Sequence, residues 1–279
     1  MSTPEPVVVP GASISIWRDG PELDGARTAA LGAFSCETAE AGAAAIRAAM
    51  EQLRKEGFAA VLGPMDGTTW AKHRLVVESD GRASFLLEPV NPAHYVDAFE
   101  ESGLTIVSWY LSAERPSDIP MSGSAAPKGL SLRNLDMARA EAELTRIHAL
   151  SLESFASNRF YQPIGLEDFL ASYRPVLGVV DPELVFIAED EAGELQGFLF
   201  AVPDYAEGPK PGRVILKTYA SRVKGGGSMM ANAFHPRAKA KGFDRVIHAL
   251  MHESNLSVTH SGNAGGKVFR RYGLWGGRL

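Results

Sequence analysis

Cysteine is almost absent from the sequence, because Cys36 is the one cysteine among 279 residues. One cysteine cannot form an internal disulfide or a multi-cysteine metal site, so we expect Cys36 to be a small packed side chain and the protein to bind no metal. No stretch approaches the roughly 18 apolar residues of a membrane helix, and the first residues lack the basic and apolar regions of a secretory signal. These absences predict a cytoplasmic protein that binds no membrane.

Positive charge is in slight deficit, with 28 Lys and Arg against 33 Asp and Glu. A net charge of −5 argues against the basic surface that non-specific nucleic-acid binding requires, so no nucleic-acid partner is expected. The charges are unevenly spread: residues 1–125 hold 9 basic and 17 acidic residues, whereas residues 210–279 hold 13 basic residues and only Asp244 and Glu253. The basic end indicates either a solvated face or a site for a polyanion such as phosphate.

The length predicts about two domains of roughly 150 residues. Residues 114–127 are rich in Pro, Ser and Gly and have no hydrophobic period, which is typical of a linker. We therefore expect a first domain over residues 1–121, a linker over residues 122–128 and a second domain over residues 129–279.

Hydrophobic patterns and turn residues predict strands and helices in the first half. Gly57 is expected to end the first helix, and Asn91 and Pro92 to begin the second as N-cap and first helical residue. The strands at 74–77 and 85–87 are expected to pair as a hairpin. The other expected elements are strands at 27–34, 58–62 and 104–112 and helices at 39–56 and 91–102.

The second half predicts a mixed α/β arrangement with a crossover. Strands at 184–189, 195–202 and 213–219 form an expected antiparallel meander. Pro236 is expected to break the helix that begins near Ser228, because proline removes a helical hydrogen bond at a cost of ~3 kcal/mol. The other expected elements are strands at 130–133, 245–250 and 267–275 and helices at 136–155, at 166–173 and within 255–262.

The segment Gly225-Gly226-Gly227-Ser228 follows a strand and opens a helix, so its backbone amides and the positive helix end can converge on an anion. Glycine permits the positive φ and the close approach that such a turn needs. A P-loop would need a lysine that is missing here, and a dinucleotide-binding fingerprint would need a glycine where Met230 stands. Phosphate binding of another type and a plain strand-to-helix turn both remain open.

Arg222-x-x-Gly225-x-Gly227, placed after a three-strand meander, resembles the acetyl-coenzyme A loop of the GNAT acetyltransferase superfamily. The resemblance covers residues 129–279. It implies a mostly antiparallel central sheet flanked by helices, and acetyl-coenzyme A as co-substrate. The cofactor-binding residues that it implies are Leu216, Lys217, Thr218, Arg222, Val223, Lys224, Gly225, Gly226, Gly227, Ser228, Met229 and Asn255.

The family's general acid has no direct counterpart in this sequence. Asn255 and Gly266 match the family's asparagine and glycine, but Gly262 stands where the family has its tyrosine. A proton donor is needed for the leaving thiolate. Tyr272 and His260 are therefore the candidate catalytic residues, with Ser261 beside the vacant position as another substitute, although an aromatic residue packed on a half-buried strand is the commoner role for a tyrosine such as Tyr272. A general base is not identifiable, because carboxylates such as Glu189 act in such sites through water.

The first half resembles a degenerate copy of the same fold. Its loop at residues 35–40 lacks the glycine pattern, and Glu37 and Glu40 would repel a phosphate, so we expect this half to bind no cofactor. Residues 63–70 are typical of such tandem proteins, or form an ordinary surface turn.

The resemblance implies transfer of an acetyl or related acyl group to a primary amine of a small molecule or peptide, by direct attack in a ternary complex. Phe160, Tyr161 and Tyr219 are the candidate substrate-binding residues, and the acidic first half favours a cationic acceptor. The alternatives are a catalytically silent acyl-coenzyme A binder and a tandem interaction scaffold. The oligomeric state is left open.

Overall fold

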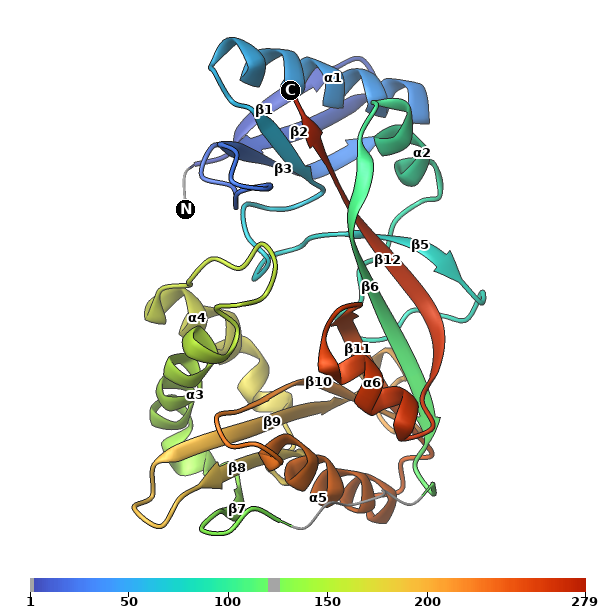
Figure 1. Ribbon diagram of the computed structural model, residues 1–279. Helices are drawn as coiled ribbons and strands as arrows, with labels where there is room; N and C mark the ends of the chain where they lie inside the picture. Colours follow the sequence, from blue (N-terminus) through green and yellow to red (C-terminus); the bar gives the residue numbers. More distant parts are fainter. Residues whose placement is uncertain (1–2, 120–125) are drawn as a thin grey trace.

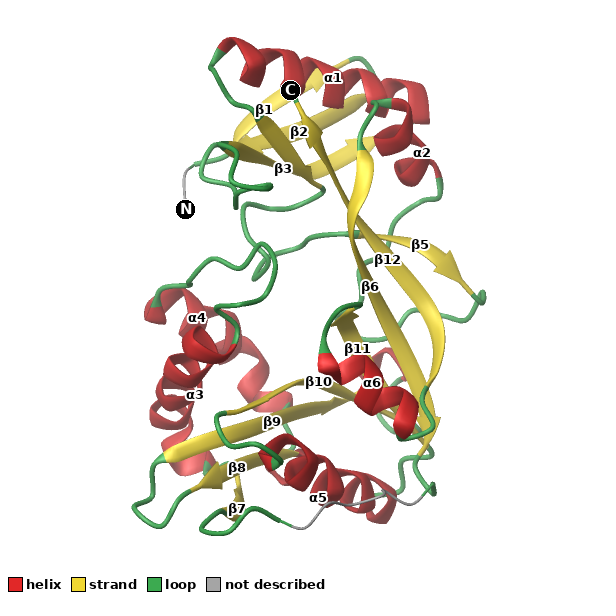
Figure 2. Ribbon diagram, in the orientation of Figure 1, coloured by secondary structure: helices red, strands yellow, loops and turns green. Residues whose placement is uncertain are grey.

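The computed structural model describes residues 3–119 and 126–279, so residues 122–125 of the expected linker lie outside the described residues. The strands of the described part belong to a single mixed sheet, and helices lie against its faces (Figure 2). This arrangement confirms the predicted α/β class with a mostly antiparallel central sheet flanked by helices, since among the described strands only β3–β4 and β10–β11 pair in parallel.

The first half builds one end of the sheet (Figure 1). Its elements are β1 (Glu5–Val9), β2 (Ala12–Trp17), β3 (Thr28–Cys36), α1 (Ala39–Lys55), β4 (Ala60–Gly63), β5 (Leu75–Ser79), α2 (His94–Glu101) and β6 (Thr105–Pro116). The first three strands are antiparallel, and α1 connects β3 to its parallel neighbour β4. The helix α1 covers β1, β2 and β3, with α2 beside it.

The second half builds the other end of the sheet. Its elements are β7 (Ser131–Asn134), α3 (Ala140–Ser154), α4 (Leu166–Tyr173), β8 (Val185–Glu189), β9 (Leu195–Pro203), β10 (Arg213–Ser221), α5 (Gly226–Ala240), β11 (Arg245–His252), α6 (Leu256–Asn263) and β12 (Lys267–Arg278). Short 3-10 helices cover Met137–Arg139, Arg174–Val179, Pro182–Leu184 and Tyr205–Glu207. The predicted meander of β8, β9 and β10 is antiparallel, as expected, and α5 connects β10 to its parallel neighbour β11.

The two halves exchange their last strands. The sheet order is β1-β2-β3-β4-β12-β6-β11-β10-β9-β8-β7, so β6 of the first half pairs with β11, and β12 of the second half pairs with β4. The long antiparallel pair β6 and β12 crosses the middle of the molecule (Figure 1). Each end of the sheet is therefore completed by the other half of the chain, while the boundaries expected at residues 121 and 129 stay a prediction.

Alternating side chains of the strands pack against helices on opposite faces. In β9, Leu199 belongs to a core cluster with Met230 and Phe234 of α5, whereas Phe198 belongs to a cluster with Leu144 of α3. This is the period of two that a strand imposes on its side chains. It places α5 on one face of the sheet and α3 with α4 on the other.

The helix α5 continues through Pro236, so the expected break near His235 is wrong. The residues around the proline explain this. Met230, Phe234 and Ala238 are fully buried on one face of α5. Burying this apolar face offsets the hydrogen bond that Pro236 cannot donate.

The expected hairpin between 74–77 and 85–87 is also wrong. Strand β5 pairs with β12 instead, with Val76 opposite Tyr272. Phe85 is buried in a core cluster with residues of the second half, including Ile215. Asn91 does not cap α2, because its side chain accepts a hydrogen bond from the Val76 amide (2.7 Å) and the helix begins at His94.

Candidate active site

Strands β10 and β11 pair in parallel over a short stretch and then stop pairing. The register covers residues 213–216 against 245–248. At the same level, the pairing of β10 with β9 is irregular at Lys217, and the pairing of β11 with β6 is irregular after His248. Leu250 in this part of β11 has a φ of 55°, which interrupts a regular strand. The pairing thus ends in mid-strand, although both strands continue.

The loop after β10 leaves the beginning of α5 without a side-chain cap. Gly225 stands at the N-cap with a φ of 85°. A Cβ at Gly226 would lie 2.2 Å from Ser221 Oγ, so only glycine fits at this position without a shift. Within residues 3–119 and 126–279, the amides of Gly227 and Ser228 have no hydrogen-bond partner. Donors at the positive end of a helix are therefore available for an anion.

Arg222 anchors this loop to the sheet and to α3. Its Nε donates to Glu153 Oε2 (2.7 Å), its Nη1 donates to the Leu195 carbonyl (2.9 Å) and its amide donates to the Gln196 carbonyl (2.9 Å). The ion pair with Glu153 partly neutralises the guanidinium. Lys224 is exposed in the same loop and adds positive charge there.

The other predicted cofactor residues lie around the same strand and helix. Leu216 is buried in the cluster beneath α5, and Thr218 follows the irregularity of β10 at Lys217. The Met229 amide donates to the Gly225 carbonyl (2.9 Å), which closes the first turn of α5. Asn255 begins α6, the helix that follows β11.

The two candidate proton donors occupy different surroundings. The Tyr272 side chain is fully buried on β12, its hydroxyl donates to Glu88, and it bonds to Ser112 Oγ (2.9 Å). Burial, followed by the charge of Glu88, raises the pKa of Tyr272 well above its ordinary value. His260 is exposed on α6. Tyr272 thus stays protonated within a hydrogen-bond network, and His260 is in contact with solvent.

The candidate substrate-binding aromatics divide into two groups. Phe160 packs in a buried cluster with Tyr110 and Tyr272, and the Tyr161 ring meets Trp70 edge-on with ring centres 6.1 Å apart. Both therefore contact residues of the first half. Tyr219 packs beneath α5 instead, where a Cβ on Gly227 would lie 3.0 Å from its ring.

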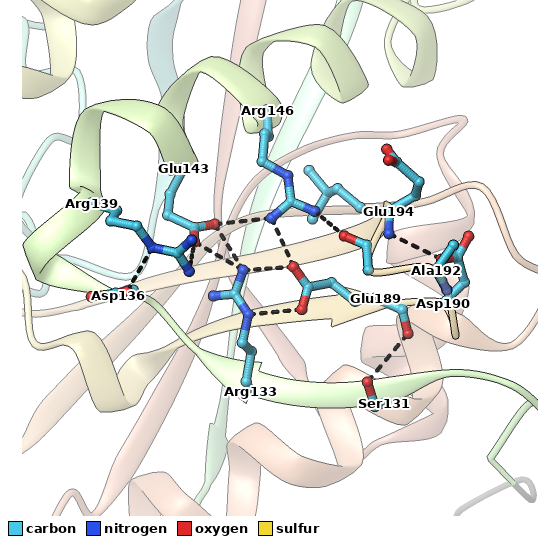
Figure 3. Close-up of polar contacts among 12 residues, drawn as sticks. Ser131, Arg133, Asp136, Arg139, Glu143, Arg146, Glu189, Asp190, Ala192 and Glu194 are labelled. Atoms are coloured by element: carbon cyan, nitrogen blue, oxygen red, sulfur yellow. Dashed lines mark hydrogen bonds and ion pairs between the residues drawn. The ribbon is translucent and has the colours of Figure 1, made fainter.

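Glu189 belongs to a network of ion pairs at the end of β8 (Figure 3). Its carboxylate accepts hydrogen bonds from Arg133 (2.6 and 2.8 Å) and Arg146 (2.7 Å). Chiefly because of the bond from Arg133, the pKa of Glu189 falls to about 2. A carboxylate held in this way is a poor base at neutral pH.

The first half has the same strand, helix and parallel strand in β3, α1 and β4, but its own chain fills the equivalent place. The Met65 amide donates to the Leu31 carbonyl of β3 (2.7 Å), and Asp66 Oδ1 accepts from the Ala33 amide (2.6 Å). At the start of α1, the Thr38 side chain accepts from the Ala41 amide (3.2 Å). These contacts use donors that an anion would otherwise bind.

Sequence reasoning missed three residues that lie beside this site. His73 and Arg74 come from the segment between β4 and β5. Burial is the main cause of the lowered pKa of His73, to which the charges of Arg74 and Lys217 add, and burial followed by the charge of Arg74 lowers the pKa of Lys217. The ring of Tyr110 on β6 lies between these elements, 4.0 Å from the Arg74 guanidinium carbon. No local motif marks Arg74, because its neighbours come from distant parts of the sequence.

No helix in the described ranges is long and apolar enough to cross a membrane. In the same ranges, no group of three or more His, Cys, Asp and Glu side chains is arranged to hold a metal ion.

No protein-family model matches the sequence, and no curated protein matches it either. Solved structures resemble the fold. A GCN5-related N-acetyltransferase from Sphaerobacter thermophilus has a TM-score of 0.55 at 15% identity, over 96% of this chain and 76% of that one. A tandem GNAT protein from the clavulanic acid biosynthesis pathway has a TM-score of 0.52 at 14% identity, over 96% of this chain and 79% of that one.

A GCN5-related N-acetyltransferase from Anabaena variabilis has a TM-score of 0.57 at 10% identity. The match covers 95% of this chain and 59% of the Anabaena chain. Together with the separated strands β10 and β11 and the open start of α5, these likenesses establish that the chain has the fold of the GCN5-related N-acetyltransferases in a tandem arrangement.

Proposed function

We propose that the chain transfers an acetyl or related acyl group from acetyl-coenzyme A to a primary amine of a small molecule or peptide, by direct attack of the neutral amine in a ternary complex. The open start of α5, which follows the strand β10 that separates from β11, carries this proposal. The corresponding helix start in the first half is closed by its own chain.

The loop residues would hold the phosphates of the cofactor. The amides of Gly227 and Ser228 would supply donors and Lys224 would supply charge, while Arg222 holds the loop in place through Glu153. Leu216, Lys217 and Thr218 would flank the pantetheine arm, with Val223 and Met229 beside the phosphates and Asn255 at the start of α6. Bound acetyl-coenzyme A would supply the thioester.

Proton transfer is the less defined part of the reaction. The attacking amine loses a proton and the departing thiolate gains one. We keep Tyr272 and His260 as the candidate donors. The Tyr272 hydroxyl is protonated at neutral pH, but its raised pKa makes it a weak acid, and its proton would have to leave the bond to Glu88 to reach the thiolate. Phe160 and Tyr161 would shape the acceptor site together with the first half, and Tyr219 would support the loop from below.

Calorimetric titration with acetyl-coenzyme A tests the cofactor site. The double variant Gly225→Asp, Gly227→Asp places two carboxylates at the start of α5, so we expect micromolar binding by the wild type and at least a hundredfold weaker binding by the variant. Gly242→Asp is the matched control: Gly242 lies just after the opposite end of α5, has a φ of 89° against 85° for Gly225, and has open space around it. Absence of binding by the wild type would remove the proposal.

A catalytically silent acyl-coenzyme A binder is the second candidate. Gly262 at the family's tyrosine position favours it, as does the commitment of the Tyr272 hydroxyl to Glu88. A screen of primary amines with release of the coenzyme A thiol as readout separates the two functions. Binding without thiol release for any amine would favour the silent binder.

A further inference from the structure

Two cationic side chains from different halves of the chain lie in the region where β10 stops pairing with β11. Arg74 lies on the Tyr110 ring, which packs with Leu250 of β11, and Lys217 comes just after the last paired residue of β10. Arg74 precedes β5, and Lys217 occupies the irregularity of β10. The segment that carries Arg74 runs between the two ends of the molecule (Figure 1). Both side chains are half-buried, and burial is the main cause of the lowered pKa of each.

The fold fixes the position of Arg74, but a hydrogen-bond donor of its guanidinium has no partner in the described residues. The Arg74 amide donates to the Pro64 carbonyl (2.9 Å), and its φ of 70° is unusual for a residue with a side chain. Its guanidinium carbon stacks 4.0 Å from the centre of the Tyr110 ring. Its Nη1 atom is buried and has no hydrogen-bond partner in the described part of the chain. A strained backbone that fixes an unsatisfied buried donor is characteristic of a binding site.

No carboxylate of the described residues compensates these charges. Neither Arg74 nor Lys217 forms an ion pair there, and the buried Glu88 is bonded to Arg270 (2.6 Å) and Tyr272. Arg74, with a pKa lowered to about 10, and Lys217, with a pKa lowered to about 8, both remain mostly protonated at pH 7. Charges that are partly withdrawn from water are commonly paired, so we expect the partner of the buried Arg74 Nη1 and of Lys217 to come from a ligand.

The position of Arg74 and Lys217 indicates which part of the reactants would bind to them. The phosphates of the cofactor belong at the start of α5, beyond the C-terminal end of β10, whereas Lys217 lies in the middle of that strand. Lys217 marks the point where β10 and β11 separate, and Arg74, Tyr110 and Phe160 lie in the same region. An anion held there is part of the acceptor or of the transferred acyl group.

We propose that Arg74 and Lys217 together bind a carboxylate of a substrate, carried either by the amine acceptor or by the acyl group. One carboxylate oxygen would accept from the unsatisfied Nη1 of Arg74 and the other from the Lys217 ammonium. The inference rests on the proposed acyltransferase function and gives the first half a role in it. It adds a carboxylate to the cationic acceptor favoured by composition, because the charge that Arg74 of the first half brings to this place is positive.

Two arms of one assay distinguish the sources of the carboxylate. In the first arm, the full-length protein and acetyl-coenzyme A are given matched amines with and without a carboxylate: L-lysine with cadaverine, L-phenylalanine with phenethylamine, and glycine with methylamine. In the second arm, succinyl-coenzyme A is compared with acetyl-coenzyme A, both in thiol release and in calorimetric binding, so that this arm does not depend on turnover.

We expect at least a tenfold preference for the carboxylate in one arm, as kcat/KM or as Kd. Arg74→Met and Lys217→Met should each reduce this preference below threefold, mainly through KM or Kd. Lys72→Met is the matched control, since Lys72 is exposed two residues before Arg74, and it should keep the full preference. Circular dichroism checks that each variant is folded. If Arg74→Met does not fold, the carboxylate preference of Arg74→Lys and Lys217→Met tests the proposal instead.

The outcomes separate this inference from the proposed function. Binding of acetyl-coenzyme A with no carboxylate preference in either arm overturns the inference and leaves the acyltransferase proposal standing. A preference that survives in both Arg74→Met and Lys217→Met also overturns it. Absence of any acyl-coenzyme A binding by the wild type overturns both proposals.

Discussion

The units β3–α1–β4 and β10–α5–β11 have the same topology. They differ in whether the start of their helix is available to bind an anion. Helix α1 begins at Thr38, whose side chain caps it, and carries Glu40 in its first turn. Helix α5 begins at Gly225, has no side-chain cap and has no acidic residue in its first turn. Whether a helix start is available to an anion therefore depends on a few local side chains and not on the fold.

The strands that precede the two helices also differ in whether the place beside them is filled by the chain itself. In the first half, Met65 and Asp66 bond to the backbone of β3, and a Cβ on Gly32 would lie 2.4 Å from both Asp66 Oδ1 and the Met65 carbonyl oxygen. In the second half, the parallel pairing of β10 ends before Lys217. In the first half the place beside β3 is thus filled by its own chain, and the segment after β4 carries Arg74 towards the second half.

An acidic residue in the first turn of α5 would make it resemble α1. We expect Ser228→Glu to weaken acetyl-coenzyme A binding at least about thirtyfold, equivalent to about 2 kcal/mol, because a carboxylate at the helix start competes with phosphate for the same amides. Calorimetric titration measures the change. Glu40→Gln on α1 is the control and should leave the affinity unchanged; a similar effect of both variants would contradict the difference between the two helix starts.

The difference in capping between α1 and α5 can also be tested through the free energy of unfolding. Thr38→Ala should lower the free energy of unfolding by about 1 kcal/mol, because the Ala41 amide loses its acceptor. Ser228→Ala in the first turn of α5 should stay within about 0.5 kcal/mol of the wild type, because no side chain caps that helix. Urea unfolding of both variants measures the two values. Equal losses would show that α5 is capped in a way absent from the described contacts.

The smallest expected effect concerns acid stability at the two ends of the sheet. Chiefly through bonds from Arg133 and Arg18 respectively, the pKa values of Glu189 and Glu56 are both lowered to about 2. A lowered carboxyl pKa stabilises the folded state above about pH 4.5, and this stabilisation is lost as the pH falls towards 2. Glu189→Gln should therefore be less stable than the wild type at pH 7, by a difference that shrinks between pH 4.5 and 2.

Glu56→Gln should follow the same pH course with a smaller amplitude. The Glu56 side chain is 31% exposed against 16% for Glu189, so solvent screens its ion pair more strongly. Urea unfolding at pH 7, 4.5 and 3 tests both variants. A difference from the wild type that does not change with pH would mean that these carboxylates contribute through packing and not through charge.

The local elements were largely predictable because their signals are local. Leu166–Tyr173 occurs as a helix at the predicted bounds, and the meander of β8, β9 and β10 agrees within two residues. The hairpin of β1 and β2 was overlooked, although Pro10-Gly11 stands between an apolar run and the alternating residues 12–17. The proposed hairpin at 74–87 failed because the partner of β5 is β12, nearly two hundred residues away along the chain, which no local pattern identifies.

The sequence by itself determined the glycine-rich start of α5, the acidic start of α1 and the helices and strands between them, because backbone conformation and capping depend on neighbouring residues. Only the tertiary structure decided the exchange of β6 and β12 between the halves, the continuation of α5 through Pro236, and the meeting of Arg74 with Lys217. These features depend on the burial of apolar faces and on contacts between residues far apart in the chain. That burial outweighs the local preference of a proline, and it places two like charges together without a partner in the described chain.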